Sequence, residues 1–196
     1  MTKSFLLAGV GGQGTILTSK ILTEGLTQLG FDIKMSEIHG MAQRGGTVTT
    51  HIKFGEKVYS PIITSAEADV ILAFEKLEAA RHLSYLKPGG TLIVNDYEIY
   101  PMSVLTGQVE YPENILDILK STVPNTVVVN AYDIAKDAGS VRAQNIVLLG
   151  AAVKILGITD LDWEQIIKSY LPEKFHEMNI KAFNAGMQEC RKHKRG

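Results

Sequence analysis

The chain has 196 residues, of which 45% are hydrophobic and 21% are charged, and its formal net charge is −1. This length suits one α/β domain, residues 1–196, and is too short for two domains of ordinary size. The near-zero charge gives the molecule as a whole no electrostatic reason to bind nucleic acid or an anionic membrane. The single cysteine, Cys190, excludes an internal disulfide and a four-thiolate iron–sulfur or zinc site made by this chain alone.

The sequence shows no segment typical of secretion or membrane insertion. The apolar run from Phe5 to Val10 is too short for a signal peptide and continues into glycines. No apolar stretch approaches the ~20 residues that span a bilayer. The basic residues of 191–195 fit a solvated helix end better than a nucleic-acid-binding arm. We therefore expect a cytoplasmic protein with no nucleic-acid or membrane partner.

The N-terminal residues have the pattern of a βαβ unit. Residues 4–8 are apolar on both faces, which predicts a buried parallel strand. A helix is expected over residues 13–29, where Gly30 would end it. The alternation of polar and apolar residues over 31–35 predicts the next strand.

The region after this second strand departs from the pattern of a plain Rossmann domain. Residues 36–46 are polar and glycine-containing, and no helical period fits them, so a long loop is expected. Strand patterns over 47–54 and 57–60 follow, and Gly55-Glu56 between them suits a type II′ turn. We therefore expect an antiparallel hairpin inserted at this point.

The rest of the chain returns to alternating strands and helices. Strands are expected over 68–74, 91–95 and 126–130, with helices near 75–86 and 113–121 between them. Three further helices are expected over 141–156, 162–170 and 173–191. The predicted fold class is α/β: a three-layer Rossmann-like sheet, mostly parallel, with an inserted antiparallel hairpin and a helical C-terminus.

A glycine-rich turn joins the first strand to the first helix and is a candidate ligand-binding loop. Gly9, Gly11 and Gly14 fill the glycine positions of a G-x-G-x-x-G motif, with Gly12 and Gln13 between them. Backbone N–H groups and the helix dipole make such a turn receptive to phosphate or carboxylate. Two other readings remain: an NAD site, or close strand–helix packing with no ligand.

The predicted loop over residues 36–46 is a second candidate site. It follows the end of a strand, where open α/β sheets bind their ligands. Its chemistry-bearing residues are a carboxylate, an imidazole, an amide and a guanidinium followed by two glycines: Glu37, His39, Gln43, Arg44, Gly45 and Gly46. The guanidinium could bind an anion with two parallel hydrogen bonds. The alternative is a solvated loop with an internal ion pair, Glu37 to Arg44. In the NAD reading, Glu37 would instead bind the ribose hydroxyls.

No catalytic constellation is recognisable elsewhere in the sequence. A nucleophile-elbow spacing and a zinc-binding histidine pair are both absent. His51 is expected to be packed or hydrogen-bonded rather than a ligand. Glu75 follows a predicted strand, so it either lines the same crevice or begins the next helix.

Several segments resemble a known family. GVGGQGTILTSKIL, followed by MSEIHGMAQRGGTVTTHIKFG and VYSPII, resembles the gamma subunit or domain of 2-oxoacid:ferredoxin oxidoreductases. Within that family, SEIHG with GMAQRGG is most similar to the beta (small) subunit of indolepyruvate ferredoxin oxidoreductase. The similarity continues through ADVILAFEKLEAARHLSYLKPGG and TLIVN to RAQNIVLLGAAVKILG, and so spans nearly the whole chain.

The resemblance implies one subunit, inactive alone, of an enzyme that oxidatively decarboxylates arylpyruvates. The products would be an aryl-acetyl-CoA, carbon dioxide and reduced ferredoxin. Thiamine diphosphate and [4Fe–4S] clusters would be held by the large partner subunit, with CoA as a possible shared substrate. No cofactor or metal is expected in this chain.

These implications lead to a hypothesis about the two loops. Residues 11–14 and 39–46 would form one anion-receptive edge facing the large subunit. Arg44 would supply positive charge to a carboxylate or a CoA phosphate, and Gln13 and Gln43 would orient that ligand. The competing hypotheses are a subunit that serves assembly only and an independent NAD-dependent oxidoreductase.

Overall fold

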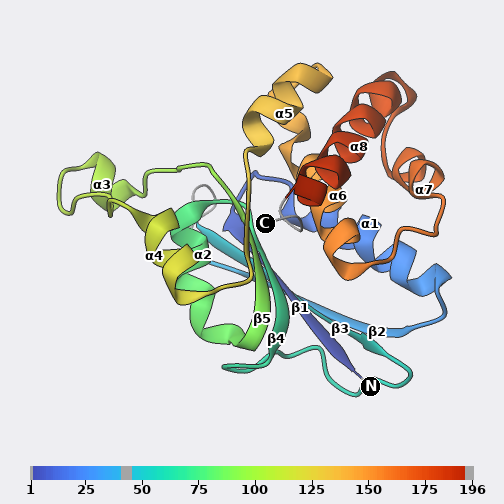
Figure 1. Cartoon of the computed structure of the whole chain (residues 1–196), viewed down its shortest axis with the longest axis horizontal. Coiled ribbons are helices and arrows are strands. Elements are labelled where there is room, and N and C mark those ends of the chain that lie inside the picture. The colour runs from blue at the N-terminus through green and yellow to red at the C-terminus, as the bar shows by residue number, and fades with distance from the viewer. Residues whose placement is uncertain (1, 41–45, 193–196) are drawn as a thin grey trace.

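The computed structural model describes residues 2–40 and 46–192 (Figure 1). Within these residues, six strands form one sheet in the order β2-β3-β1-β4-β5-β6. Their bounds are β1 Lys3–Val10, β2 Asp32–His39, β3 Thr47–Gly55, β4 Ala68–Ala73, β5 Leu86–Asn95 and β6 Thr126–Val129.

The parallel half of the sheet agrees with the sequence-based expectation. β1, β4, β5 and β6 pair in parallel along the sheet. Nearly every residue of β1 is buried, as expected for a strand that helices cover on both faces. β5 begins earlier than predicted, because Leu86 already pairs with Ala68 before a bulge shifts the register.

The inserted antiparallel element differs from the predicted hairpin. β3 lies between β1 and β2 and is antiparallel to both, so its two edges are already paired. The prediction of a strand over residues 57–60 is therefore wrong, since no free edge of β3 remains for it. Val58 instead donates its backbone N–H to the Asp32 side chain at 2.9 Å. Residues 36–39, predicted as loop, continue β2 and pair with β3.

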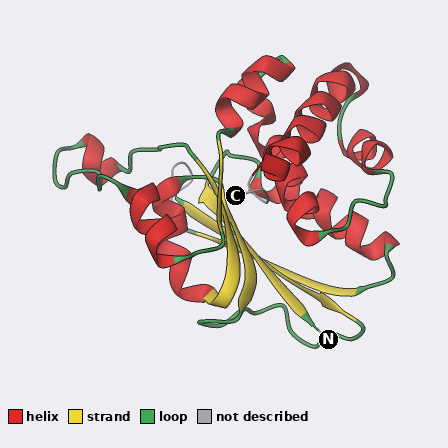
Figure 2. Ribbon diagram, viewed as in Figure 1, coloured by secondary structure: helices red, strands yellow, loops and turns green. Residues whose placement is uncertain are grey.

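Helices cover both faces of the sheet and complete three layers (Figure 2). One face carries α1 Thr15–Gln28, α5 Ala131–Ala138, α6 Gln144–Leu156, α7 Trp163–Tyr170 and α8 His176–Lys192. The other carries α2 Lys76–His82 and α4 Ile115–Thr122 over a smaller core. Short 3₁₀ turns are η1 Leu83–Tyr85, η2 Val141–Ala143 and η3 Glu173–Phe175. The four-residue helix α3, Met102–Leu105, projects away from these layers (Figure 1).

α5 and α3 were not predicted from the sequence. α5 follows β6 directly, and its N-cap Asn130 accepts a hydrogen bond from the backbone N–H of Asp133 at 3.2 Å. This capping pattern is the signal that was available. α3 has only four residues, which is too short for a helical period to be recognised.

The C-terminal helix α8 packs on α6 with the two backbones in contact. A Cβ atom at Gly150 would lie 2.2 Å from the carbonyl oxygen of Phe183, and one at Gly186 would lie 2.0 Å from that of Val147. Both positions therefore require glycine. The same helix buries Cys190 in the core. No helix in the described ranges is long and apolar enough to cross a membrane.

Candidate functional site

The crevice at the carboxyl ends of β1, β4 and β5 is the candidate site. α1 leaves β1 for one face of the sheet and α2 leaves β4 for the other, so the neighbouring strand ends open a gap between them. Open α/β sheets bind their ligands at such a point. A hollow of about 500 Å³ lies here. Its wall comprises Gly11, Gly12, Gln13, Phe74, Asn95, Tyr97, Ile99, Val141, Arg142, Gln144 and Leu148.

The glycines of the turn have two different roles. A Cβ at Gly9 would lie 2.9 Å from Thr15 and 3.0 Å from Phe74, so this glycine permits close strand–helix packing. Gly14 has φ +80°, and a Cβ there would lie 2.7 Å from the side-chain nitrogen of Asn145 on α6. Gly12 has φ +99° with nothing within 4 Å of its Cβ position, so Gly12 is the part of the turn that is open to a ligand.

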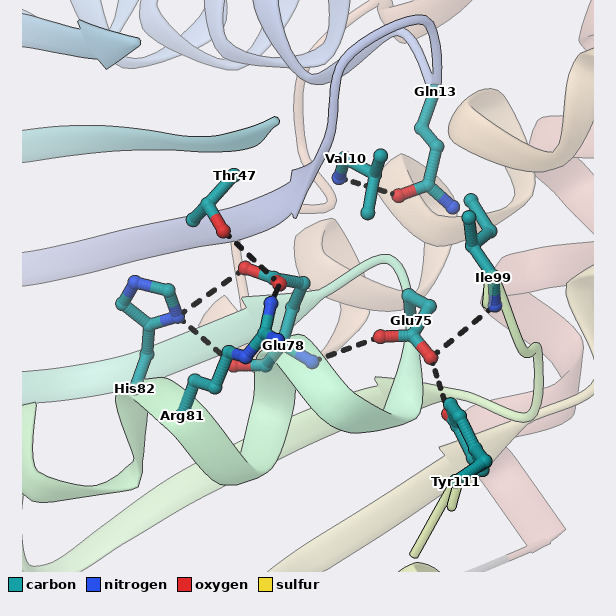
Figure 3. Close-up of polar contacts among 9 residues, drawn as sticks. All are labelled: Val10, Gln13, Thr47, Glu75, Glu78, Arg81, His82, Ile99 and Tyr111. Carbon is teal, nitrogen blue, oxygen red and sulfur yellow. Dashed lines mark hydrogen bonds and ion pairs between the residues drawn. The ribbon is translucent and has the colours of Figure 1, made fainter. Parts of the chain in front are cut away.

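Gln13 holds the turn together through its side-chain amide (Figure 3). Its Oε1 accepts from the backbone N–H of Val10 at 2.8 Å, and its Nε2 donates to the carbonyl of Phe74 at 3.0 Å. Both ends of the amide are thus engaged within the protein. Gln13 therefore fixes the shape of the crevice wall by joining the ends of β1 and β4.

The turn and the base of the second predicted loop lie together, as the two-loop hypothesis requires. The backbone N–H of Gly11 donates to the carbonyl of Gly46 at 3.0 Å, and that of Gly40 donates to Thr47 at 2.9 Å. Gln43, Arg44 and Gly45 lie outside the described residues, as does the side chain of His39, so their roles remain predictions.

Glu37 lies apart from the glycine turn. It is in β2, opposite Thr50 of β3. Because β3 separates β2 from β1, Glu37 is two strands away from the glycine-bearing strand, roughly 10 Å. A Rossmann dinucleotide site needs this acidic residue on the strand next to the glycine turn. The geometry therefore counts against the NAD reading.

Arg142 is a cationic residue of the crevice that was not predicted from the sequence. It follows the N-cap Ser140 of η2 and is exposed at the rim of the 500 Å³ hollow. Arg142 also lines an adjoining hollow of about 330 Å³, whose wall includes Gly12, Phe175 and Met178. The only available signal was a basic residue in the first turn of the helix predicted over residues 141–156, which is weak by itself.

The floor of the crevice contains the buried amide of Asn95, whose hydrogen bonds are all made within the protein. The Nδ2 of Asn95 lies 3.2 Å from the carbonyl of Phe74 and 3.2 Å from Oε1 of Gln144. Its Oδ1 accepts from the backbone N–H of Ala131 at 3.0 Å. This network connects β4, β5 and α6, and so gives the hollow a fixed floor.

Glu75 begins α2 rather than lining the crevice. Its side chain caps the helix by accepting from the backbone N–H of Glu78 at 2.9 Å. It also accepts from the Tyr111 hydroxyl at 2.5 Å and the Ile99 N–H at 3.4 Å (Figure 3). Burial, together with the hydrogen bond to Glu75, raises the pKa of Tyr111 above its ordinary value. The tyrosine therefore stays a neutral donor.

Glu78 is the second buried carboxylate on α2, and it bonds to the first residue of β3. Its Oε1 accepts from the Thr47 hydroxyl at 3.2 Å and from Arg81 at 2.6 Å (Figure 3). Its Oε2 has no hydrogen-bond partner among the described residues, and His82 Nδ1 is 3.7 Å away.

His51 is packed and hydrogen-bonded, as expected. It is buried on β3, its Nδ1 accepts from the backbone N–H of Ile63 at 3.0 Å, and its ring meets Tyr85 edge-on. Burial lowers its pKa, which favours the neutral acceptor form.

Comparison with known proteins gives the family. A family model described as pyruvate ferredoxin/flavodoxin oxidoreductase matches residues 4–189. The chain belongs to this family. It is 39% identical to "Indolepyruvate oxidoreductase subunit IorB" of Methanothermobacter thermautotrophicus, over 95% of this chain and 96% of that protein. It is 35% identical to the protein of the same name from Archaeoglobus fulgidus, over 97% and 96%.

A solved structure supports the same assignment. The gamma subunit of a keto/oxoacid ferredoxin oxidoreductase from Geobacter sulfurreducens superposes with a TM-score of 0.72 at 27% identity. The alignment covers 97% of this chain and 99% of that one. This member of the pyruvate ferredoxin/flavodoxin oxidoreductase family thus has the mixed sheet and flanking helices of the gamma subunits. Within the described ranges, no three His, Cys, Asp or Glu side chains are grouped so that they could hold a metal ion.

Proposed function

We propose that the chain is the small subunit of an indolepyruvate:ferredoxin oxidoreductase. The assembled enzyme would oxidatively decarboxylate an arylpyruvate to aryl-acetyl-CoA and carbon dioxide, and would pass the electrons to ferredoxin. The observation that carries the proposal is similarity over nearly the full length of both chains to subunits of that name. The larger subunit would hold thiamine diphosphate and the [4Fe–4S] clusters, because one buried thiol cannot ligate such a cluster.

The crevice is the part of this chain that we assign to ligand binding in the assembled enzyme. The open backbone at Gly12 and the exposed guanidinium of Arg142 form a concave, positively charged edge. A guanidinium binds carboxylate or phosphate through paired, charge-assisted hydrogen bonds. Arg44, on the segment whose base bonds to Gly11, would add a second cation. The ligand would be the oxoacid carboxylate or a phosphate of CoA, at the contact with the larger subunit.

The function is tested by reconstitution. The chain and its cognate larger subunit, expressed together, should reduce ferredoxin only when an arylpyruvate and CoA are both present. Either subunit alone should be inactive. Activity of the larger subunit alone at the rate of the pair would contradict the proposal, as would failure of the two chains to associate.

The site is tested in the same complex with Arg142→Ala and Arg44→Ala. Loss of one charge-assisted contact should raise the KM for CoA or arylpyruvate about tenfold, with kcat nearly unchanged. Lys57→Ala, at the opposite end of the sheet, is the matched control and should leave both constants unchanged. Unchanged kinetics in intact complexes of both arginine variants would refute a ligand role. Weaker association with unchanged turnover of the assembled fraction would indicate a subunit that serves assembly only.

A further inference from the structure

The segment that joins β5 to α4 extends away from the body of the molecule. We call residues 96–114 the acidic arm, and it carries α3 at its tip (Figure 1). Among the described elements, none packs extensively against α3. The tip is held by its own backbone bonds, such as Val104 N–H to Pro101 at 3.0 Å and Gln108 N–H to Ser103 at 2.9 Å.

The tip presents large apolar side chains to solvent. Met102 is 70% exposed, Leu105 is 64% exposed and Val109 is 54% exposed. Single exposed apolar residues are ordinary, but three on one short projecting element form a patch of the kind that marks an interaction site. These side chains do not stabilise the isolated chain, since no core lies beneath them.

The base of the arm is fixed to α2 by buried and partly buried polar contacts. Glu75 accepts from Tyr111 and from the Ile99 N–H, which come from the two sides of the arm (Figure 3). Lys76 pairs with Asp96 at 3.2 Å and Glu98 at 2.6 Å. The tip is therefore presented on a preorganised base, so less conformational entropy is lost when it binds.

The arm also carries a concentrated negative charge. It contains four acidic residues and no Lys, Arg or His: Asp96, Glu98, Glu110 and Glu113. Because the whole chain has a net charge of −1, the arm carries −4 and the remainder carries +3. Asp96 and Glu98 face Lys76, whereas Glu110 and Glu113 form no ion pair with the described part of the chain.

We propose that the acidic arm docks into an apolar socket with a rim of Lys and Arg on the larger subunit. The inference rests on the proposed function, which supplies that subunit. The exposed tip would fill the socket, and Glu110 and Glu113 would face the basic rim. A second copy of this chain is a poorer occupant. A two-fold contact would bring two like-charged arms together, and a head-to-tail contact would form rings or open filaments.

The experiment measures association of the cognate larger subunit with the full chain carrying Met102→Asp and Leu105→Asp. Placing a charge at two positions that would be buried in the complex should raise the dissociation constant at least about thirtyfold. Tyr59→Asp is the matched control, because Tyr59 is 87% exposed and follows β3 at the opposite end of the sheet. The control should leave association unchanged. Thermal unfolding of each variant alone verifies that it folds.

A second variant tests the charge of the arm separately from its apolar tip. Glu110→Lys with Glu113→Lys should weaken association about tenfold at low salt, and high salt should remove most of the difference. Association of Met102→Asp/Leu105→Asp with wild-type affinity would overturn the inference. It would also be overturned if the arm variants abolished only self-association. If the wild-type chain itself fails to bind the larger subunit, the proposed function fails, and that outcome is distinct from failure of the arm alone.

Discussion

The crevice and the acidic arm both follow the carboxyl ends of strands, but they are built in opposite ways. In the crevice, the half-buried amide of Gln13 and the buried amide of Asn95 are hydrogen-bonded within the protein, and the surface is concave. In the arm, Met102 and Leu105 are exposed on a convex tip. Binding in the crevice would therefore depend mainly on the shape of the backbone, because few of its side chains are free. Binding by the arm would depend on the chemistry of its exposed side chains.

Two consecutive residues at the end of β4 hold these regions in place. The carbonyl of Phe74 accepts hydrogen bonds from the side-chain amides of Gln13 and Asn95. The carboxylate of Glu75 accepts hydrogen bonds from the Tyr111 hydroxyl and the Ile99 N–H. The crevice wall and the base of the arm are thus fixed at two adjacent residues. Substitutions in one region should therefore change its stability or binding and leave those of the other region unchanged.

The largest expected effect is in the crevice, from Gly14→Ala. The new Cβ would lie 2.7 Å from the side chain of Asn145 at a residue with φ +80°. Strain and overpacking together should lower the free energy of unfolding by about 3 kcal/mol, measured by denaturant titration. Gly12→Ala is the control, since it has φ +99° but open space around its Cβ. The control should lose only about 1 kcal/mol. Equal losses would show that packing on α6 is not what requires Gly14.

A smaller effect is expected at the base of the arm from Tyr111→Phe. Removing the hydroxyl withdraws a donor from the buried Glu75 carboxylate and should cost roughly 2 kcal/mol of stability. Hydrogen exchange should speed up in residues 96–114, while the KM values assigned to the crevice stay constant. Tyr100→Phe, which removes a hydroxyl 3.3 Å from Glu98 at the surface, should change stability by less than about 0.5 kcal/mol. Faster exchange over residues 9–14 in Tyr111→Phe would show that the regions are coupled.

The smallest expected effect is a pH dependence of the free energy of unfolding, and it comes from the Cys190 thiol in the core behind the crevice. Burial raises the pKa of Cys190 from about 9 to about 11. Between these values the unfolded chain loses its thiol proton before the folded chain does, so stability falls as pH rises and is fully retained below pH 9. At pH 10 the loss from this group should be about 1 kcal/mol. Cys190→Ala should remove that part of the slope in urea titrations at pH 8 and 10. An identical slope in both proteins would mean that the thiol is not buried as described.

The sequence predicted most of the fold because local patterns dictate it. The apolar runs over residues 68–74 and 126–130 are short and rich in β-branched residues, which favours parallel strands over helices. The position of β3 was not predictable in the same way, since strand order depends on which edges are free after the chain folds. Residues 57–60 have the local sequence pattern of a strand, but both edges of β3 are already paired, so no strand edge is free for them to join.

The candidate site was predicted in part for a similar reason. The glycine turn has a local signature, and its bond to Gly46 agrees with the expectation that the two loops meet. Arg142 enters the same crevice from a segment 128 residues after Gly14. Only the packing of α6 against α1 brings it there, and no local pattern encodes that packing. The apolar tip of the arm was overlooked because four helical residues carry no periodicity.

The backbone contact between α6 and α8 bears on the order in which the chain matures during synthesis. α6 is complete at Leu156, but the helix that covers it begins only at His176. Until Phe183 and Gly186 have emerged, the groove at Gly150 and the adjoining face of the sheet stay open to water. A nascent chain therefore has its sheet before it has a closed core. Association with the larger subunit should therefore follow the packing of α8 onto α6.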